Sequence, residues 1–210
     1  MTERVSERRY RGLPPEVRQA DRQERFRQAG LDVFSTTGYM SSSVPEICRA
    51  AGLSTRQFYE EFTSREGLLL DLFARIHSEA RSFVSQALRE SAQEDARTGI
   101  AAGIAAYIHA LADDPRRARL VLIESVGINH TVNRLRERER ADWAVLIENA
   151  ARARLPDGYS PLGGYHTAMT AYIGAVNAVV AEWAKGEPRE PMDELTDVLV
   201  PLLMAVLGIE

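Results

Sequence analysis

The stretch STRQFYE, residues 54–60, combines side chains that can contact nucleic acid. Phe58 and Phe62 lie one helical turn apart and must both face a core, because a helix of two turns is stable only when it is packed. At 100° per residue, Arg56 and Glu60 then lie on the opposite side, with the glutamine and tyrosine on the flanks. Arginine can form two hydrogen bonds with guanine, glutamine can pair with adenine, and glutamate can accept from cytosine. This face therefore carries chemistry that suits base edges in a DNA groove.

A preceding short helix and a sharp turn would hold this face in position. The sequence SVPE, residues 43–46, is a capping box, in which the serine hydroxyl accepts from the glutamate amide and the carboxylate reaches back. Gly52 can adopt the left-handed conformation that ends a helix, and Ser54 can cap the next helix. This arrangement predicts a helix-turn-helix. The alternative is that Arg56 and Glu60 form only an ion pair on a solvated surface.

Length and composition predict a chain with a real hydrophobic core. The protein has 210 residues, 45% of them hydrophobic, which excludes global disorder. The net charge of −4 argues against a wholly basic nucleic-acid binder, but residues 4–27 hold eight arginines against four acidic residues. The single cysteine, the absence of a signal-like start and the short, proline-containing apolar run at 198–207 predict a cytoplasmic protein with no membrane partner.

Apolar residues recur at helical spacing along the whole chain, and no strand-like alternation persists. We expect a disordered, arginine-rich leader at residues 1–14, a helix-turn-helix domain at 15–64 and a second helical domain at 65–210. The pattern predicts an all-α protein of about nine helices. Their expected ranges are 15–37, 44–51, 54–61, 65–91, 95–112, a short helix after Pro115, 131–155, 165–185 and 193–207.

Residues 26–69, FRQAGLDVFSTTGYMSSSVPEICRAAGLSTRQFYEEFTSREGLL, resemble the DNA-binding module of TetR-type (TetR/AcrR) transcriptional regulators. The resemblance implies a DNA-binding regulator rather than an enzyme, and a homodimeric repressor of a palindromic operator in double-stranded DNA. It also implies release by a small, largely apolar effector. The matching residues are Phe34, Gly38, Tyr39, Val44, Ile47, Ala51, Gly52, Ser54, Phe58, Tyr59, Phe62, Arg65 and Glu66.

The resemblance also assigns DNA contacts position by position. Thr55, Arg56 and Gln57 would enter the major groove, and residues on either side would bind phosphates. Thr55 and Glu60 depart from the family, which often has lysine or arginine at the first place and tyrosine, histidine or a basic residue at the second. The helix is therefore less basic, which implies a weaker attraction to the DNA backbone that the leader arginines would offset. The full expected DNA-binding set is Ser43, Ser54, Thr55, Arg56, Gln57, Tyr59, Glu60 and Arg65.

The remaining two-thirds resembles, less specifically, the ligand-binding and dimerisation domain of the same family. Small residues share one face of the helix at 165–185 and larger apolar residues share another, so this helix should be covered on two sides. The expected dimer interface is Ala168, Ala171, Ala175, Ala178, Leu199 and Leu202. The candidate pocket residues, each of which is alternatively ordinary core, are Phe73, His77, Tyr107, Glu124, Trp143, Tyr172 and Asn177.

An all-α enzyme or a helical adaptor without DNA binding is the alternative function. The sequence has no nucleophile elbow, HExxH motif, phosphate-binding loop or cysteine pair, and no Glu-x-x-His motif of a di-iron bundle. An adaptor would leave the groove-facing residues without a role. We therefore expect no catalytic residues, no metal site and no cofactor.

Overall fold

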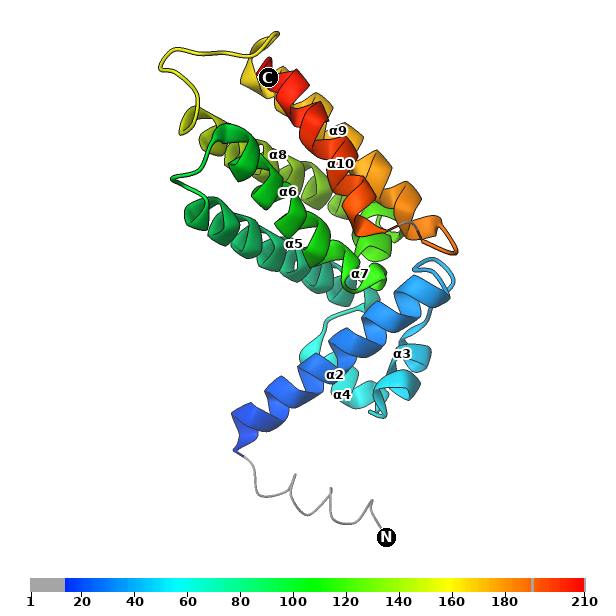
Figure 1. Cartoon of the computed structure of the whole chain (residues 1–210). Helices are drawn as coiled ribbons and strands as arrows, with labels where there is room; N and C mark the ends of the chain where they lie inside the picture. Colours follow the sequence, from blue (N-terminus) through cyan, green and yellow to red (C-terminus); the bar gives the residue numbers. More distant parts are fainter. Residues whose placement is uncertain (1–13, 190, 210) are drawn as a thin grey trace. The chain divides into compact units, whose positions relative to one another are not determined.

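The computed structural model describes residues 14–189 and 191–209, which form helices joined by loops (Figure 1). These residues contain nine α-helices, one π-helix and no strand, so the all-α prediction is confirmed. None of the described helices is both long and apolar enough to cross a membrane. The predicted leader, apart from Pro14, lies outside the described residues. The helices are α2 (Pro15–Thr36), α3 (Val44–Ala51), α4 (Thr55–Glu61), α5 (Arg65–Glu90), α6 (Ala96–Ala112), α7 (Pro115–Arg119), η1 (Leu120–Glu124), α8 (His130–Arg152), α9 (Gly164–Lys185) and α10 (Met192–Leu207).

The chain forms two compact units, one ending at Leu72 and one beginning at Phe73, so the division falls within α5. In the first unit α2 packs against both α3 and α4. Phe26 of α2 meets the rings of Phe58 and Phe62 edge-on, with centroids 5.3 and 6.3 Å away. This confirms that the two phenylalanines of the short helix face a core.

The two short helices begin and end at the residues that the sequence indicated. Ser43 Oγ accepts from the amide of Glu46 at 3.4 Å, and Gly52 ends α3 with φ at +63°. Both halves of a capping box close between Ser54 and Gln57, at 3.2 and 2.9 Å. The helix-turn-helix is therefore present. One detail differs from the prediction, because the Glu46 carboxylate accepts from the hydroxyl of Thr37 at 3.0 Å instead of reaching back to the cap.

Three arginines of the arginine-rich segment bind within the first unit. Arg22 Nε donates to Glu61 at 2.9 Å, and Arg27 Nε donates to Asp71 at 2.7 Å. Arg25 Nη2 donates to the last carbonyl of α3 at 2.8 Å, which satisfies a group that a helix end leaves unpaired. These side chains therefore stabilise the module in addition to giving it positive charge.

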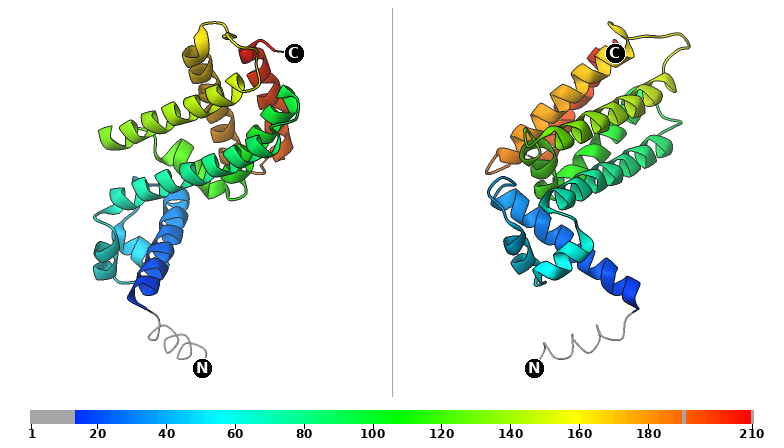
Figure 2. Two further views of the ribbon diagram at one scale, coloured as in Figure 1. Left: turned by 90° about the vertical axis from the view of Figure 1, so that its left-hand side faces the viewer. Right: turned by 180° about the vertical axis from the view of Figure 1, so that it is seen from behind.

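The second unit is a helical bundle in which α6 contacts α10, and α9 contacts α8, α10 and α7. Both views of Figure 2 show α9 and α10 lying side by side. The core of the second unit includes the fully buried side chains of Ile108, Leu111, Leu120, Met169, Leu199 and Leu207.

The π-helix η1 was not among the elements predicted from the sequence. Its turn closes with a hydrogen bond from the amide of Ser125 to the carbonyl of Leu120, five residues earlier, at 3.1 Å. π-helical turns are rare in proteins, and a large share of those that occur lie at functional sites. This one contributes Val121 and Leu122 to the lining of the cavity described below.

Candidate functional site

Helix α4 presents a polar face to solvent. The buried side is Phe58, whereas Thr55, Arg56, Tyr59 and Glu60 are exposed. The side chain of Arg56 is 89% exposed, so it can reach a macromolecule without rearrangement of the module. The faces of this helix agree with those expected from 100° per residue.

The polar groups of this face differ in how far they are already engaged. Arg56 Nε lies 3.1 Å from Glu60 Oε1, which is the surface ion pair considered as the alternative. An exposed pair of this kind is weak and opens easily, so it does not prevent a base contact. Gln57 Oε1 accepts from the amide and the hydroxyl of Ser54, at 2.9 and 3.0 Å, so its amide oxygen belongs to the cap and only its NH₂ group remains for DNA. Between Arg56 and Gln57, the two longer candidates for base contacts, Arg56 is therefore the one that the helix cap does not engage.

The expected phosphate contacts lie in different environments. The Tyr59 side chain is exposed, and Ser43 is exposed at the start of α3. Arg65 is half-buried, donates to the carbonyl of Ser42 and stacks over the ring of Tyr39 at 4.4 Å. A guanidinium has five donors, so a phosphate contact by Arg65 would use those that these interactions leave. Arg65 has a structural role in the module that the sequence did not indicate.

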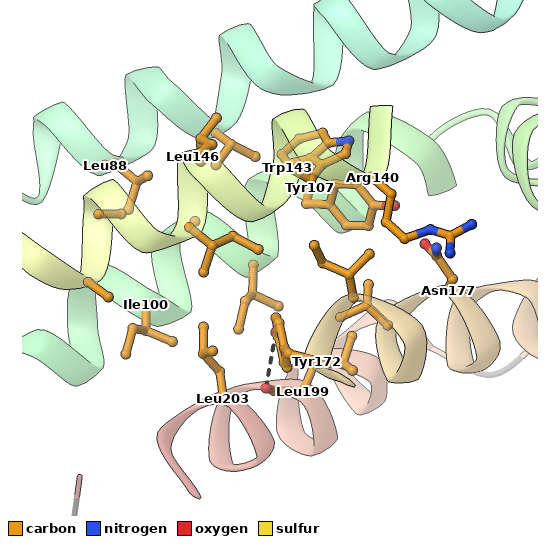
Figure 3. A pocket seen from close by; sticks show the side chains of 18 of the residues that line it. Leu88, Ile100, Tyr107, Arg140, Trp143, Leu146, Tyr172, Asn177, Leu199 and Leu203 are labelled. Atoms are coloured by element: carbon orange, nitrogen blue, oxygen red, sulfur yellow. Dashed lines mark hydrogen bonds between the residues drawn. The ribbon is translucent and has the colours of Figure 1, made fainter. Parts of the chain in front are cut away.

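The second unit contains a cavity of about 120 Å³. Its lining is mostly apolar and comes from α5, α6, η1, α8, α9 and α10, with labelled side chains in Figure 3. One of the seven candidate pocket residues, Glu124, is not part of the lining and pairs with Arg119 at 3.3 Å. The six that line the cavity are Phe73, His77, Tyr107, Trp143, Tyr172 and Asn177.

Two hydrogen bonds orient polar side chains along the cavity. Trp143 Nε1 donates to His77 Nδ1 at 3.0 Å, and because indole is only a donor, the proton of the neutral imidazole is on Nε2. Burial lowers the pKa of His77 to about 3, and the positive charges of Arg81 and Arg136 add to this effect. The hydroxyl of Tyr172 donates to the carbonyl of Leu199 at 3.3 Å, shown as a dashed line in Figure 3. Burial also raises the pKa of Tyr172 and of Tyr107, so all three groups are neutral near pH 7.

Charged residues at the cavity were not among those predicted from the sequence. Arg136, Glu139 and Arg140 of α8 line it together with Trp143, and Arg154 lines it farther along the chain. The first three lie seven, four and three residues before Trp143, which is the spacing of one helical face. This spacing relative to a predicted pocket residue was the available signal.

The residues of the expected dimer interface divide into two groups. Ala171 and Ala178 are exposed, and Ala175 and Leu202 are half-buried. Ala168 and Leu199 are buried within the chain itself, and Leu199 also lines the cavity. Val198, Pro201 and Ala205 of α10 are also exposed. No cluster of three or more histidine, cysteine, aspartate or glutamate side chains suited to a metal ion occurs in the part of the chain that the structure describes.

Comparisons with known proteins support the same interpretation. Residues 27–72 match the family model described as "Bacterial regulatory proteins, tetR family". No curated protein matches the sequence significantly.

Solved structures match over most of both chains. The transcriptional regulator FadR from Bacillus subtilis, in complex with stearoyl-CoA, is 20% identical and covers 89% of this chain and 99% of its own, with a TM-score of 0.69. A regulatory protein of the tetR family from Rhodococcus RHA1 is 20% identical, and the match covers 90% of this chain and 98% of that protein, with a TM-score of 0.69. A putative transcriptional regulator from Pseudomonas aeruginosa PAO1 is 17% identical, covers 95% of each chain and has a TM-score of 0.72. At these identities the likeness shows the fold.

Members of this family are DNA-binding regulators rather than enzymes. The helix-turn-helix thus lies in a segment that matches the tetR family of bacterial regulatory proteins, and the all-α fold is that of the solved regulators above.

Proposed function

We propose that the protein is a homodimeric repressor that binds a palindromic operator and is released by a small, largely apolar ligand. The observation that carries the proposal is the side chain of Arg56, 89% exposed on a short helix whose start is fixed by a complete capping box. A rigid helix with an exposed guanidinium, held only by a weak surface ion pair, suits bidentate recognition of guanine in the major groove. Since its target is the chromosome, the repressor acts in the cytoplasm.

A single copy of α4 contacts only a few base pairs, so discrimination requires two copies. The outer side of α9 and α10 supports a dimer, because Ala171, Ala178, Val198 and Pro201 leave small and apolar side chains in solvent. Small residues let two helices approach closely, and burial of apolar area is the main favourable contribution to association. A two-fold axis would present two reading helices to half-sites about 34–36 Å apart.

The cavity supports the ligand part of the proposal. It is enclosed mainly by apolar side chains, which is the usual character of small-molecule sites. Helix α5 provides Phe73 and His77 to the cavity lining, and its first turns provide the buried Leu68 and Leu69 to the core of the first unit. Release then follows if the ligand binds best to a position of α5 that is incompatible with operator binding.

The experiment starts with selection of bound sequences from random DNA duplexes by the full-length protein, followed by a gel shift on the selected operator. Ala175→Arg places a long charged side chain on the proposed interface and should give a monomer that no longer binds the operator. Ala141→Arg, the same change at an exposed position of α8, is the matched control. Sedimentation and gel shift on the same samples test both parts. Failure to enrich any sequence favours the adaptor, and tight operator binding by a monomeric variant refutes the dimer mechanism.

A further inference from the structure

Two arginines at the cavity have no acidic partner among the described residues. Arg140 lines the cavity, is exposed to solvent, and forms no hydrogen bond or ion pair within the described part of the chain. Arg136 Nη1 donates to the carbonyl of Val121 at 2.9 Å and to Ser125 Oγ at 2.6 Å, both of which are neutral acceptors. No carboxylate of the described residues therefore balances either guanidinium, and that of Arg140 is solvated by water.

The remaining charges near this end of the cavity are already compensated. Glu139, the one carboxylate in the described lining, pairs with Arg81. The pKa of Arg136 is lowered by burial and by the positive charge of Arg140, which lies one helical turn away on α8. The site therefore favours a negatively charged group.

Arg154, the other arginine of the lining, is in a different situation. It donates to the carbonyl of Leu88 at 2.9 Å and to that of Ala150 at 3.3 Å, in the last turns of α5 and α8. Helix C-termini carry partial negative charge, which these contacts use to balance the guanidinium. The uncompensated charge is therefore confined to Arg136 and Arg140.

Uncharged donors are available at the same end. Figure 3 shows Arg140 and Asn177 at one end of the pocket, with Leu88 and Ile100 at the other. His77, whose neutral ring keeps its proton on Nε2, lies close enough to Arg136 for that charge to lower its pKa. The cavity is thus polar and positive at one end and apolar at the other.

The dimensions of the cavity indicate a thin ligand. Phe73 and Leu88 both line it and are fifteen residues apart on α5, which corresponds to roughly 22 Å at 1.5 Å per residue. The lining residues thus extend over about four turns of α5. A flexible hydrocarbon chain suits such an elongated space better than a compact multi-ring molecule does.

We propose that the effector is an acyl-chain amphiphile whose anionic head group binds Arg140 and Arg136 beside Asn177, while its chain extends toward Leu88 and Ile100. This inference rests on the proposed function, since it names the chemical class of the ligand that would release the repressor. The anion is either the carboxylate of a free fatty acid or a phosphate of an acyl thioester.

The test measures binding of three twelve-carbon probes to the full-length protein by isothermal titration calorimetry. The probes are dodecanoate, the uncharged 1-dodecanol and dodecanoyl-CoA, all kept below the concentrations at which they aggregate. Arg140→Gln removes the charge and keeps most of the side chain. Arg138→Gln is the matched control, because Arg138 is exposed on the same helix as Arg140 is, but does not line the cavity.

If the contact is charge-assisted, Arg140→Gln should weaken binding of the anionic probe roughly ten- to a hundredfold and leave the affinity for dodecanol unchanged. Arg138→Gln should bind all three probes as the wild type does. A defect with dodecanoate identifies a carboxylate ligand, and one confined to dodecanoyl-CoA identifies a thioester. Equal binding of dodecanol and both anionic probes by the wild type, or anion binding unaffected by Arg140→Gln, overturns the inference. Gel shifts on the same samples separate the two proposals, because failure of the ligand inference leaves operator binding intact.

Discussion

Replacing Arg56 by alanine should selectively weaken operator binding. A bidentate contact between arginine and guanine contributes about 1–3 kcal/mol of discrimination. In the free protein Arg56 is paired with Glu60 at 3.1 Å, and giving up an exposed pair of this spacing costs about 0.3–0.5 kcal/mol. The net loss is then roughly 0.5–2.5 kcal/mol per subunit, or about 1–5 kcal/mol for a dimer with two reading helices.

Fluorescence anisotropy with labelled duplexes measures this loss, between about fivefold and a few thousandfold in Kd for the selected operator. Scrambled DNA should lose much less, because only one surface charge per subunit is removed. Arg49→Ala, at an exposed arginine of α3, controls for loss of charge alone. Since Arg56 is exposed, thermal stability should stay within about 0.5 kcal/mol of wild type. Unchanged operator affinity, or equal losses on both duplexes, would show that α4 does not read bases through Arg56.

Three further predictions concern packing, protonation and the amino-terminal segment. Gly30→Ala should destabilise the first unit by about 1 kcal/mol despite the better helix propensity of alanine, because its Cβ would lie 2.7 Å from Cδ2 of the fully buried Leu68. Hydrogen exchange of the α2 amides measures this, and wild-type protection would contradict it. His77 has a pKa of about 3 in the folded protein and 6.5 in the unfolded chain. Between pH 7 and pH 5 only the unfolded chain takes up the proton, so the free energy of unfolding of the second unit should fall by about 2 kcal/mol. His77→Gln should remove this dependence on pH. Tryptophan fluorescence measures the unfolding, because both tryptophans lie in the second unit. An equal pH dependence in the two proteins would refute the assignment to His77. Deleting residues 1–13, which lie outside the described residues and include Arg8, Arg9 and Arg11, should flatten the dependence of log affinity on log salt, whereas an unchanged slope would leave these arginines no role in DNA binding.

The reading module could be predicted in detail because its signals are local. Ser43, Gly52 and Ser54 act on backbone groups within three or four residues of themselves, so their effects can be read from the order of residues alone. The serine and glutamine at 54 and 57 also fit a capping-box pattern, which would have shown that the glutamine is partly engaged. Base-reading chemistry and helix-capping chemistry compete for the same side chain there.

Contacts between distant residues could not be predicted in the same way. Arg65 lies over Tyr39 and bonds to the carbonyl of Ser42, across a separation of more than twenty residues. Nothing in the local sequence specifies such a contact, because it depends on how α2, α3 and α5 pack. The π turn of η1 likewise differs from an α-helix only in that an amide bonds to the carbonyl five residues earlier instead of four. The spacing of apolar residues over five positions is too short to distinguish these two patterns.

The cavity shows that the charged residues of a sequence do not by themselves reveal which charges the fold leaves without a partner. Arg136 and Arg140 are four residues apart on a helix that also contains Arg134, Glu137 and Arg138, so in sequence they resemble an ordinary solvated face. Packing gives the two arginines a different meaning, because it places them at an apolar cavity whose one described carboxylate already pairs with Arg81. Charge that is unbalanced next to a hydrocarbon lining is stabilised by an anion that carries its own hydrocarbon. The proposed ligand class thus follows from the charges that no carboxylate of the folded chain balances, whereas the proposed DNA-binding face follows from the side chains that a short helix presents.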